Sequence, residues 1–474
     1  MTREAADLID ESVKTETPED LEDLALRDDY ALNPAYVEMV IDAADAGDGA
    51  RLRELLGALH PADVADLMGF LTADYREQVI PNLDPTALAE IISELEDNLR
   101  EEVLDAVPSA TLAKALEELD SDDAADVVDD LDKRKRAQVL AAMPEGDRAA
   151  IETALAYDDE TAGRLMQREV LAAPQFWTVG QTIDHVQATT EDLPELFFEV
   201  YVVDPAFKPV GAAPVSALLR SHRDTPLSDI MEPVNEITVD QDQEEVAYIF
   251  DKYHLISAPV VDDAGRLVGQ ITVDDIVGVI TEESEEDILA LAGVSDAGRD
   301  ASVWGIARSR LPWLIVNTLT AALAASVINA FQAEIAKLVT LAVLMPVVAS
   351  LGGNAGTQTL AVAVRALASR ELNAANATRI VMREMSVGVL NGLTLAIIMT
   401  GAVFLWLGDV RLCITLALAL LINLFVASVA GILVPLTLDR LGRDPAVSSS
   451  VFVTFVTDFM GFLSFLGLAA LILL

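Results

Sequence analysis

The residue best placed to do chemistry is Asp458, which lies 12 residues into an apolar stretch that runs from Ala446 to the C-terminus. At about 1.5 Å per residue, a helix would place it near the middle of a bilayer-length segment. An ionised carboxylate costs at least about 2.5 kcal/mol at that depth. The other long apolar stretches contain no deep Lys, Arg or His that could pair with it. We therefore expect its partner to be water or a permeating cation. The alternative is a protonated or hydrogen-bonded structural Asp.

A second polar feature is the segment 346–358, with the sequence PVVASLGGNAGTQ, inside another apolar stretch. Pro346 removes a helix hydrogen bond, and the glycines permit a break that exposes carbonyl oxygens. Irregular backbone at membrane depth is tolerated where it lines a water-filled cavity or is buried in protein. The sequence thus predicts a pore, although close packing of helices through small residues is an alternative. The candidate pore residues are Asp458, Thr454 on the same helix face, Gly352, Gly353, Asn354 and Gln358.

The donor atoms of this predicted pore indicate which ion it would carry. Carbonyl, amide and carboxylate oxygens suit Mg²⁺, which keeps much of its water and accepts one or two carboxylates. An anion pathway would instead need basic residues at depth. Since Co²⁺, Mn²⁺ and Ni²⁺ also accept oxygen ligands, a coupled divalent cation exchanger of broader selectivity is the alternative to a Mg²⁺ channel.

The charges divide the chain into two unlike halves. Residues 1–304 contain 70 Asp and Glu against 21 Lys and Arg, whereas residues 305–474 contain 7 against 10. This excludes a single soluble globule, and the acidic half disfavours nucleic acid, which needs Lys and Arg to neutralise its phosphates. Uncharged gaps of 23, 27, 24 and 27 residues and the final stretch each suffice for a membrane helix of about 20 residues. We predict five such helices. The single cysteine excludes a disulfide framework.

The basic residues of the apolar half predict its orientation in a cytoplasmic membrane. Lys337 and Arg411 fall on one side of the five predicted helices. The other side holds Arg308, Arg310, Arg365, Arg370, Arg379, Arg383, Arg440 and Arg443. The positive-inside bias places these eight residues and the N-terminus in the cytoplasm, and the C-terminus outside. The start, MTREAADLIDES, has no apolar core, so we expect no cleavable signal peptide.

Within the acidic half, an apolar residue recurs every 12 positions, which predicts one short helix per 12 residues in a stacked superhelix. The recurring residues are Leu59, Leu71, Leu83, Leu95, Val107, Leu119, Leu131, Met143 and Leu155. In this region Asp122 and Asp126 share a helix face at i, i+4, where like charges repel. A solvated face is the ordinary explanation of such a run.

Residues 163–283 predict two similar α/β modules. The segments 199–204 and 257–262 are typical of buried strands followed by turns, and 267–272 completes a hairpin. A helix is expected to start at Val273 and to continue through TEESEEDILALAG, where acidic residues crowd a few turns. A divalent cation that bridged them to acids of neighbouring modules would turn repulsion into attraction, as a gate requires.

These segments resemble the MgtE family of Mg²⁺ channels over essentially the whole chain. The motifs that carry the resemblance are TAGRLM (161–166), GQITVDD (269–275), EED (285–287), PVVASLGGNAGTQ (346–358) and GRDPA with the later TD (442–458). The resemblance implies a multidomain membrane protein with an all-α superhelical N domain, tandem α/β CBS modules, a connecting plug helix and a five-helix α transmembrane domain. The expected bounds are an acidic tail 1–32, the N domain 33–156, CBS modules 157–225 and 226–281, the plug helix 282–305 and the transmembrane domain 306–474.

The resemblance also implies how such a protein works. It would be a homodimer in the cytoplasmic (inner) membrane, with a pore between the two transmembrane units and hydrated Mg²⁺ held by Asp458. Mg²⁺ would also be the regulatory ion, closing the pore when it is plentiful in the cytosol. Carried over by motif, the sensing acids are Asp122, Asp126, Glu244, Asp275, Glu283, Glu286 and Asp287. Gly278 and His254 depart from the family pattern, because some members have Asp there.

A nucleotide site and an enzymatic activity have less support in the sequence. The second CBS module carries Thr272 and Asp275 in a G-h-h-T-x-x-D pattern, where ATP could bind. The first module, with GAAPVSA at 211–217, lacks both the hydroxyl and the acid. The four histidines are scattered and no GxxxxGK[ST] phosphate loop is present. We therefore expect a transporter and not an enzyme.

Overall fold

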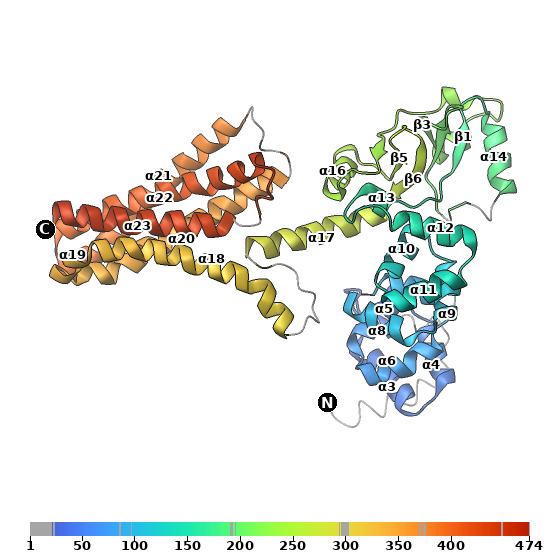
Figure 1. The fold of residues 1–474 in the computed structure, drawn as a ribbon, viewed down its shortest axis with the longest axis horizontal. Coiled ribbons are helices and arrows are strands. Elements are labelled where there is room, and N and C mark those ends of the chain that lie inside the picture. Colours follow the sequence, from blue (N-terminus) through green and yellow to red (C-terminus); the bar gives the residue numbers. More distant parts are fainter. Residues whose placement is uncertain are drawn as a thin grey trace. The chain divides into compact units, whose positions relative to one another are not determined.

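The computed structural model describes residues 21, 24–84, 87–95, 97–189, 193, 194, 196–292, 294, 303–368, 370, 372, 376–446 and 449–473. The chain forms two compact units, residues 1–280 and 281–474, which are described separately (Figure 1). Most of the predicted acidic tail and the greater part of 293–302 in the predicted plug helix lie outside the described residues.

The first unit begins with a stack of short helices that follows the 12-residue period. Prolines occupy the first position of two of them, Pro34 and Pro61, where the missing N–H has no cost. Asp48 and Asp132 cap two others through their side chains. The predicted all-α N domain is confirmed. Its helices are α3 (Pro34–Asp45), α4 (Gly49–Leu56), α5 (Pro61–Phe70), α6 (Ala73–Val79), η2 (Ile80–Asn82), α7 (Leu88–Ser93), α8 (Asp97–Ala106), α9 (Ser109–Leu116), α10 (Ser121–Asp129), α11 (Lys133–Ala142) and α12 (Glu145–Ala154).

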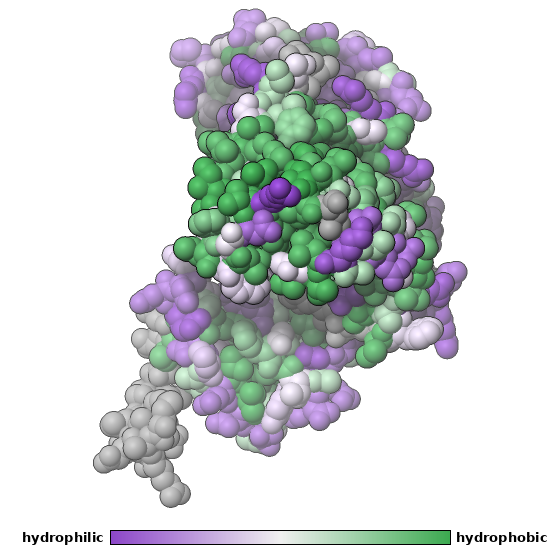
Figure 2. All heavy atoms as spheres, turned by 90° about the vertical axis from the view of Figure 1, so that its left-hand side faces the viewer, coloured by the Kyte–Doolittle hydropathy of each residue, from purple (hydrophilic) through white to green (hydrophobic). Residues whose placement is uncertain are grey.

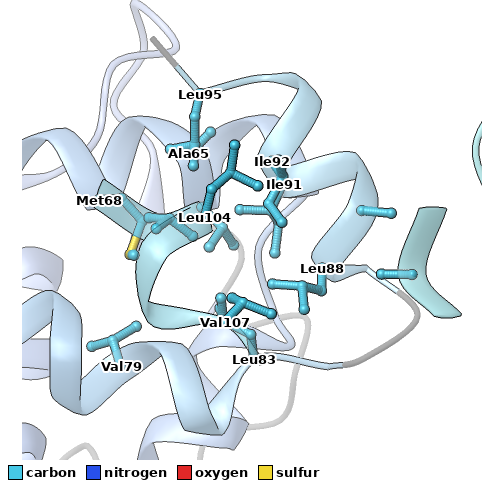
Figure 3. Packing of buried hydrophobic residues seen from close by; sticks show 14 of the residues in the cluster. Ala65, Met68, Val79, Leu83, Leu88, Ile91, Ile92, Leu95, Leu104 and Val107 are labelled. Carbon is cyan, nitrogen blue, oxygen red and sulfur yellow. The ribbon is translucent and has the colours of Figure 1, made fainter. Parts of the chain in front are cut away.

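The recurring apolar residue stands at the end of a helix, where the chain turns back into the core. Leu71 and Met143, for example, are the C-cap residues of α5 and α11. Leu83, Leu95 and Val107 pack into a common core with side chains of neighbouring helices (Figure 3). The period of 12 is therefore the length of one helix and one turn.

Two arginines that lie two repeats apart in the sequence donate hydrogen bonds to backbone carbonyls at helix ends. Arg76 donates to the carbonyl of Leu71 at 2.6 Å and forms an ion pair with Glu102. Arg100, 24 positions later, donates to the carbonyl of Leu95 at 3.2 Å and forms an ion pair with Asp130 at 3.0 Å. Carbonyls at a helix C-terminus lack partners within the helix, so these arginines stabilise the stack.

After α13 (Ala162–Leu165), the unit contains two three-stranded sheets with the same topology. In each, the first two strands are parallel, the last two are antiparallel, and a bulge falls at the end of the middle strand. This confirms the tandem α/β modules. The first contains β1 (Ala172–Pro174), α14 (Val179–Ala188), β2 (Glu199–Val203), β3 (Pro209–Pro214), α15 (Val215–Arg220) and η4 (Leu227–Asp229). The second contains β4 (Ile237–Thr238), α16 (Gln243–Tyr253), β5 (Ser257–Val261) and β6 (Leu267–Thr272), followed by α17 (Val273–Leu291).

The second unit contains five helices that are long and apolar enough to cross a membrane, as the charge gaps predict. They are α18 (Val303–Ala330), α20 (Thr340–Ala368), α21 (Ala377–Leu407), α22 (Val410–Arg440) and α23 (Ser449–Ile472), with the short α19 (Gln332–Lys337) between the first two. In the most apolar window of α22, 56 % of the residues are buried, against 11 % in α18. Helix α22 contacts α20, α21 and α23 and is therefore the central helix. The face of this unit that Figure 2 shows is largely hydrophobic.

The predicted helix break at 346–358 is wrong, because α20 runs unbroken from Thr340 to Ala368. Pro346 lies within the helix and removes only one N–H, which membrane helices tolerate when neighbouring groups compensate. The glycines of this segment do not interrupt the helix; Gly352 and Gly356 are buried where other helices pack.

Candidate cation sites

Two neighbouring helices of the second unit present polar side chains on an otherwise apolar surface. Asn354 and Gln358 are exposed, one turn apart on α20. On α23, Thr454 is exposed and Asp458 is half-buried, also one turn apart. Helices α20 and α23 contact each other. The four side chains offer amide, hydroxyl and carboxylate oxygens, the donors that a hydrated Mg²⁺ accepts. We call these four residues the polar face.

Three hydroxyl residues that sequence reasoning did not select extend the same two stripes. Ser350 and Thr357 are exposed on α20, at helical spacing from Asn354. Ser450 is half-buried on α23, and its carbonyl accepts a hydrogen bond from the Thr454 hydroxyl at 2.8 Å. A search for small hydroxyl residues at i±3 and i±4 from Asn354 and Thr454 would have found all three.

Close helix contacts position the polar face. A Cβ on Gly356 would lie 2.7 Å from a methyl group of Val453 and 3.3 Å from that of Thr457, so α20 and α23 approach each other closely at this point. Gly352 is buried against Asn423 of α22, as the close-packing alternative describes. Gly353, in contrast, has no atom within 4 Å of its Cβ position.

In the first unit, a second group of acids forms where two helices begin. Asp122 and Asp123 lie in the first turn of α10, and Asp274 and Asp275 lie in the first turn of α17. Asp122 is buried, with 7 % of its surface exposed. The partial positive charge of a helix N-terminus favours carboxylates in this position. We call these four residues the Asp122–Asp275 cluster.

Burial and mutual repulsion perturb the acids of this cluster. Burial raises the pKa of the Asp122 carboxyl well above its usual range, and the charge of Asp275 adds to the rise. Burial, followed by the charge of Asp126, raises the pKa of Asp123 to about 6. For Asp275, burial raises the pKa to about 7 although hydrogen bonds from Thr272 oppose the rise. Such a group of carboxylates needs protons or a cation to offset its charge.

Local hydrogen bonds fix both helix starts. The backbone N–H and the hydroxyl of Thr272 donate to the Asp275 carboxylate at 3.2 and 2.8 Å, which is half of a capping box. At α10, the backbone N–H and the hydroxyl of Ser121 donate to Glu169 at 3.3 and 2.8 Å. Glu169 is 48 positions from Ser121, so this contact joins α10 to the segment that precedes β1. These contacts orient Asp122 and Asp275 before any ligand arrives.

Asp126, a predicted ligand, lies one turn further along α10 and already has a cationic partner. Arg164 of the TAGRLM segment forms ion pairs with Asp126 at 3.1 Å and with Asp129 at 3.2 Å. Sequence reasoning did not select Arg164, Asp123 or Asp274. Asp123 and Asp274 adjoin predicted ligands in the sequence. The contact of Arg164 with Asp129 joins residues 35 positions apart, so no local sequence pattern predicts it.

The remaining predicted ligands lie on α16 and α17. Glu244 is exposed in the first turn of α16. Glu283, Glu286 and Asp287 follow Ile280 on α17 and so belong to the second unit. There, burial raises the pKa of Asp287, and the charges of Asp444 and Glu283 add to the rise. Asp444, in the loop after α22, was not selected from the sequence.

The described residues contain no group of three or more His, Cys, Asp or Glu arranged to hold a metal ion. A cation at the Asp122–Asp275 cluster would therefore have few carboxylate ligands and keep much of its water. This fits Mg²⁺, which dehydrates reluctantly and is commonly held through one or two carboxylates. It fits a structural zinc site poorly.

Three family models match the chain. "Divalent cation transporter" covers residues 345–468, "MgtE intracellular N domain" covers 59–160, and "CBS domain" covers 227–282.

Curated relatives match over most of their length. The magnesium transporter MgtE of Thermus thermophilus is 34 % identical over 334 residues, which cover 69 % of this chain and 73 % of that protein. The protein of the same name from Enterococcus faecalis is 34 % identical over 322 residues, covering 68 % and 71 %. The one from Bacillus subtilis is 30 % identical over 331 residues, covering 69 % and 73 %.

Two solved structures each match about half of this chain. A crystal structure of the cytosolic domain of the Mg²⁺ channel MgtE in complex with ATP has a TM-score of 0.49 and 32 % identity. It matches 51 % of this chain and 99 % of that chain. The soluble part of a magnesium transporter has a TM-score of 0.47 and 30 % identity, with coverage of 53 % and 98 %.

Proposed function

The chain belongs to the MgtE family of magnesium transporters, and from this premise we propose that it is a Mg²⁺-gated Mg²⁺ channel. As a member of that family it is a multi-pass membrane protein that transports Mg²⁺. The gating, the pore residues, the homodimer and the orientation of the termini are parts of the proposal.

The observation that carries the pore assignment is the polar face. Asp458 and Thr454 on α23 and Asn354 and Gln358 on α20 interrupt a surface that otherwise suits lipid. A carboxylate facing hydrocarbon would be costly, whereas the same carboxylate facing a second copy of the chain could line an aqueous path. We therefore place the pore between two copies in the cytoplasmic membrane, with the N-terminus in the cytoplasm and the C-terminus outside.

The sensor is proposed to be the Asp122–Asp275 cluster together with Glu283, Glu286 and Asp287 on α17. When Mg²⁺ is scarce, the charges of the ionised carboxylates repel one another. At an effective dielectric constant of about 20, two charges about 6 Å apart repel by nearly 3 kcal/mol before screening. Mg²⁺ would offset this repulsion and hold α17 in the closed arrangement. A ligand can shift a gate only if it binds the two states with different affinity.

Asp275 is also the acid of the pattern that could bind ATP. Its carboxylate already accepts two hydrogen bonds from Thr272 and neighbours other acids. A nucleotide phosphate would add negative charge to this environment. We therefore assign Asp275 to a cation and not to a nucleotide, and assign the chain no enzymatic reaction.

Substitution of Asp458 tests the pore. In purified full-length protein in liposomes, we expect Asp458→Asn to abolish Mg²⁺ influx, because the ion loses its only deep carboxylate. Asp439→Asn is the matched control, since Asp439 is exposed near the end of α22. Mg²⁺ influx through Asp458→Asn at the wild-type rate would refute the pore. Reversal potentials that follow the Mg²⁺ gradient alone would exclude a coupled exchanger.

A further inference from the structure

The central helix of the membrane unit buries an amide where it meets two other helices. Asn423 of α22 has 0 % of its surface exposed, and its Nδ2 donates to the carbonyl of Val348 in α20 at 2.9 Å. Its Oδ1 is buried without a hydrogen-bond partner among the described residues. Burial of an unpaired amide oxygen is unfavourable, so this side chain is not explained by stability alone.

Two glycines from different helices enclose the amide. A Cβ on Gly352 of α20 would overlap Nδ2 of Asn423, and a Cβ on Gly461 of α23 would lie 2.8 Å from the same atom. Both contacts would be shorter than a van der Waals contact. The amide therefore fills a space that is available only because both neighbours are glycines. We call Asn423, Gly352 and Gly461 the Asn423 joint.

The joint adjoins the polar face on both helices. Gly352 precedes Asn354 by two residues, and Gly461 follows Asp458 by three. A rotation or shift of α20 or α23 at the joint would therefore move the oxygen ligands proposed to line the pore. Membrane helices associate mainly through packing, and interhelical hydrogen bonds contribute modestly. The shape of the Asn423 side chain thus sets how close α20 and α23 can approach α22.

We propose that Asn423 is a positioning residue for ion passage, which holds α20 and α23 at the separation and rotation that the polar face needs. The inference rests on the proposed function, because the residues it positions are the proposed pore ligands. Mg²⁺ requires a smaller and more regular ligand shell than Ca²⁺. Loss of the joint should therefore alter ion selectivity as well as flux.

The first experiment uses glycine pairs in full-length protein reconstituted into liposomes. We expect Gly352→Ala to lower Mg²⁺ influx about tenfold, because the new methyl group overlaps the amide. Gly401→Ala, at an exposed position of α21 outside the proposed pore, is the control and should stay within about twofold, since its Cβ position is open. On α23, Gly461→Ala and Gly467→Ala form the same kind of pair, because Gly467 also has an open Cβ position.

A double variant tests whether the effect passes through Asn423. Asn423→Ala removes the group that the Gly352 methyl would strike, so adding Gly352→Ala to Asn423→Ala should cost less than about twofold. The proposal fails if Gly352→Ala and Gly401→Ala behave alike, or if the losses from Gly352→Ala and Asn423→Ala multiply as in independent sites. These comparisons remain informative even if Asn423→Ala folds poorly, because the two glycine pairs do not require it.

Selectivity separates positioning from a merely structural role. Asn423→Ala should lower the Mg²⁺-over-Ca²⁺ influx ratio about threefold or more in protein that keeps the wild-type elution profile in detergent. An unchanged ratio in such protein would overturn the inference.

Asp458→Asn in the same assay distinguishes failure of the positioning role from failure of the pore assignment. If it abolishes influx while Asn423→Ala keeps the wild-type ratio, only the positioning role fails. If Asp458→Asn conducts normally, the pore assignment itself fails.

Discussion

Arg164 forms an ion pair with a carboxylate oxygen of Asp126 at 3.1 Å, so the acidic helix α10 already has a cationic partner supplied by the chain. The same guanidinium group reaches Asp129, and the Arg164 side chain is only 10 % exposed. A partly buried charge is screened less by salt than a surface charge. Its field opposes a second cation at the nearby first turn of α10, which carries Asp122 and Asp123.

From this arrangement we predict that Arg164→Gln makes the cytosolic sensor bind Mg²⁺ more tightly. Removal of one positive charge from beside α10 should lower the Mg²⁺ concentration for half-maximal protease protection of the cytosolic half about three- to tenfold. Arg220→Gln serves as the control, since Arg220 is exposed in α15 of the first CBS module. A requirement for more Mg²⁺ in Arg164→Gln would contradict the prediction.

The Asp122–Asp275 cluster predicts an unusual dependence of stability on pH. In the folded chain the pKa of Asp123 is about 6 and that of Asp275 about 7, against an ordinary 3.8. Between about pH 4 and 7 the folded state therefore binds more protons than the unfolded state. The free energy of unfolding consequently falls as pH rises through that window. One pKa unit corresponds to about 1.4 kcal/mol. Because Asp123 and Asp275 are only half-buried, we expect a net loss in the free energy of unfolding of about 2–4 kcal/mol.

The measurement is the thermal unfolding midpoint of the full-length protein in chelator, from pH 5 to 8. The double variant Asp122→Asn/Asp275→Asn should show a smaller decline with pH than the wild type. Added Mg²⁺ should raise the wild-type midpoint most at pH 8, where the carboxylates are ionised, and should raise that of the variant little. Equal pH profiles for the two proteins without Mg²⁺ would show that the cluster does not carry the effect.

A third prediction concerns Asp444, whose charge acts on Asp287 of α17. If a cation holds these two acids together when the channel closes, Asp444→Asn should weaken closure as strongly as Asp287→Asn. We expect either variant to need several times more cytosolic Mg²⁺ for half-inhibition of influx. Neutralisation of Glu283, Glu286 and Asp287 together should leave the channel open at millimolar Mg²⁺. Inhibition curves with Asp439→Asn as control would check this. A wild-type curve for Asp444→Asn would remove that residue from the sensor.

Periodic features of the sequence predicted the framework well. The 12-residue period predicted the short helices, because the recurring apolar residue packs into the core at a helix end. Leu71 and Leu83 are examples. Charge-free gaps gave the five long helices because a bilayer sets their length. Both signals are local, and no packing partner had to be known.

Features that depend on packing could not be read in this way. The glycines of 346–358 suggested a break, but Gly352 is explained by Asn423, 71 residues later, which sequence reasoning did not select. Asn423 is the only amide between Arg411 and Asp439, and that was a usable signal. The approach of Asp122 to Asp275 was expected from the family resemblance alone, because 153 positions separate the two residues in the chain.

The two sheets of the first unit have the same topology, including the bulge at Val203 and at Val261, yet the helices that follow them differ. The first copy continues into α15, a helix of six residues without a side-chain cap, whereas the second continues into the 19-residue α17, whose start is fastened by Thr272 and Asp275. In the proposed mechanism, the first sheet would serve as scaffold and the second would transmit the signal through α17. We expect that exchanging α15 and α17 would keep the two sheets and disconnect the proposed sensor from the proposed gate.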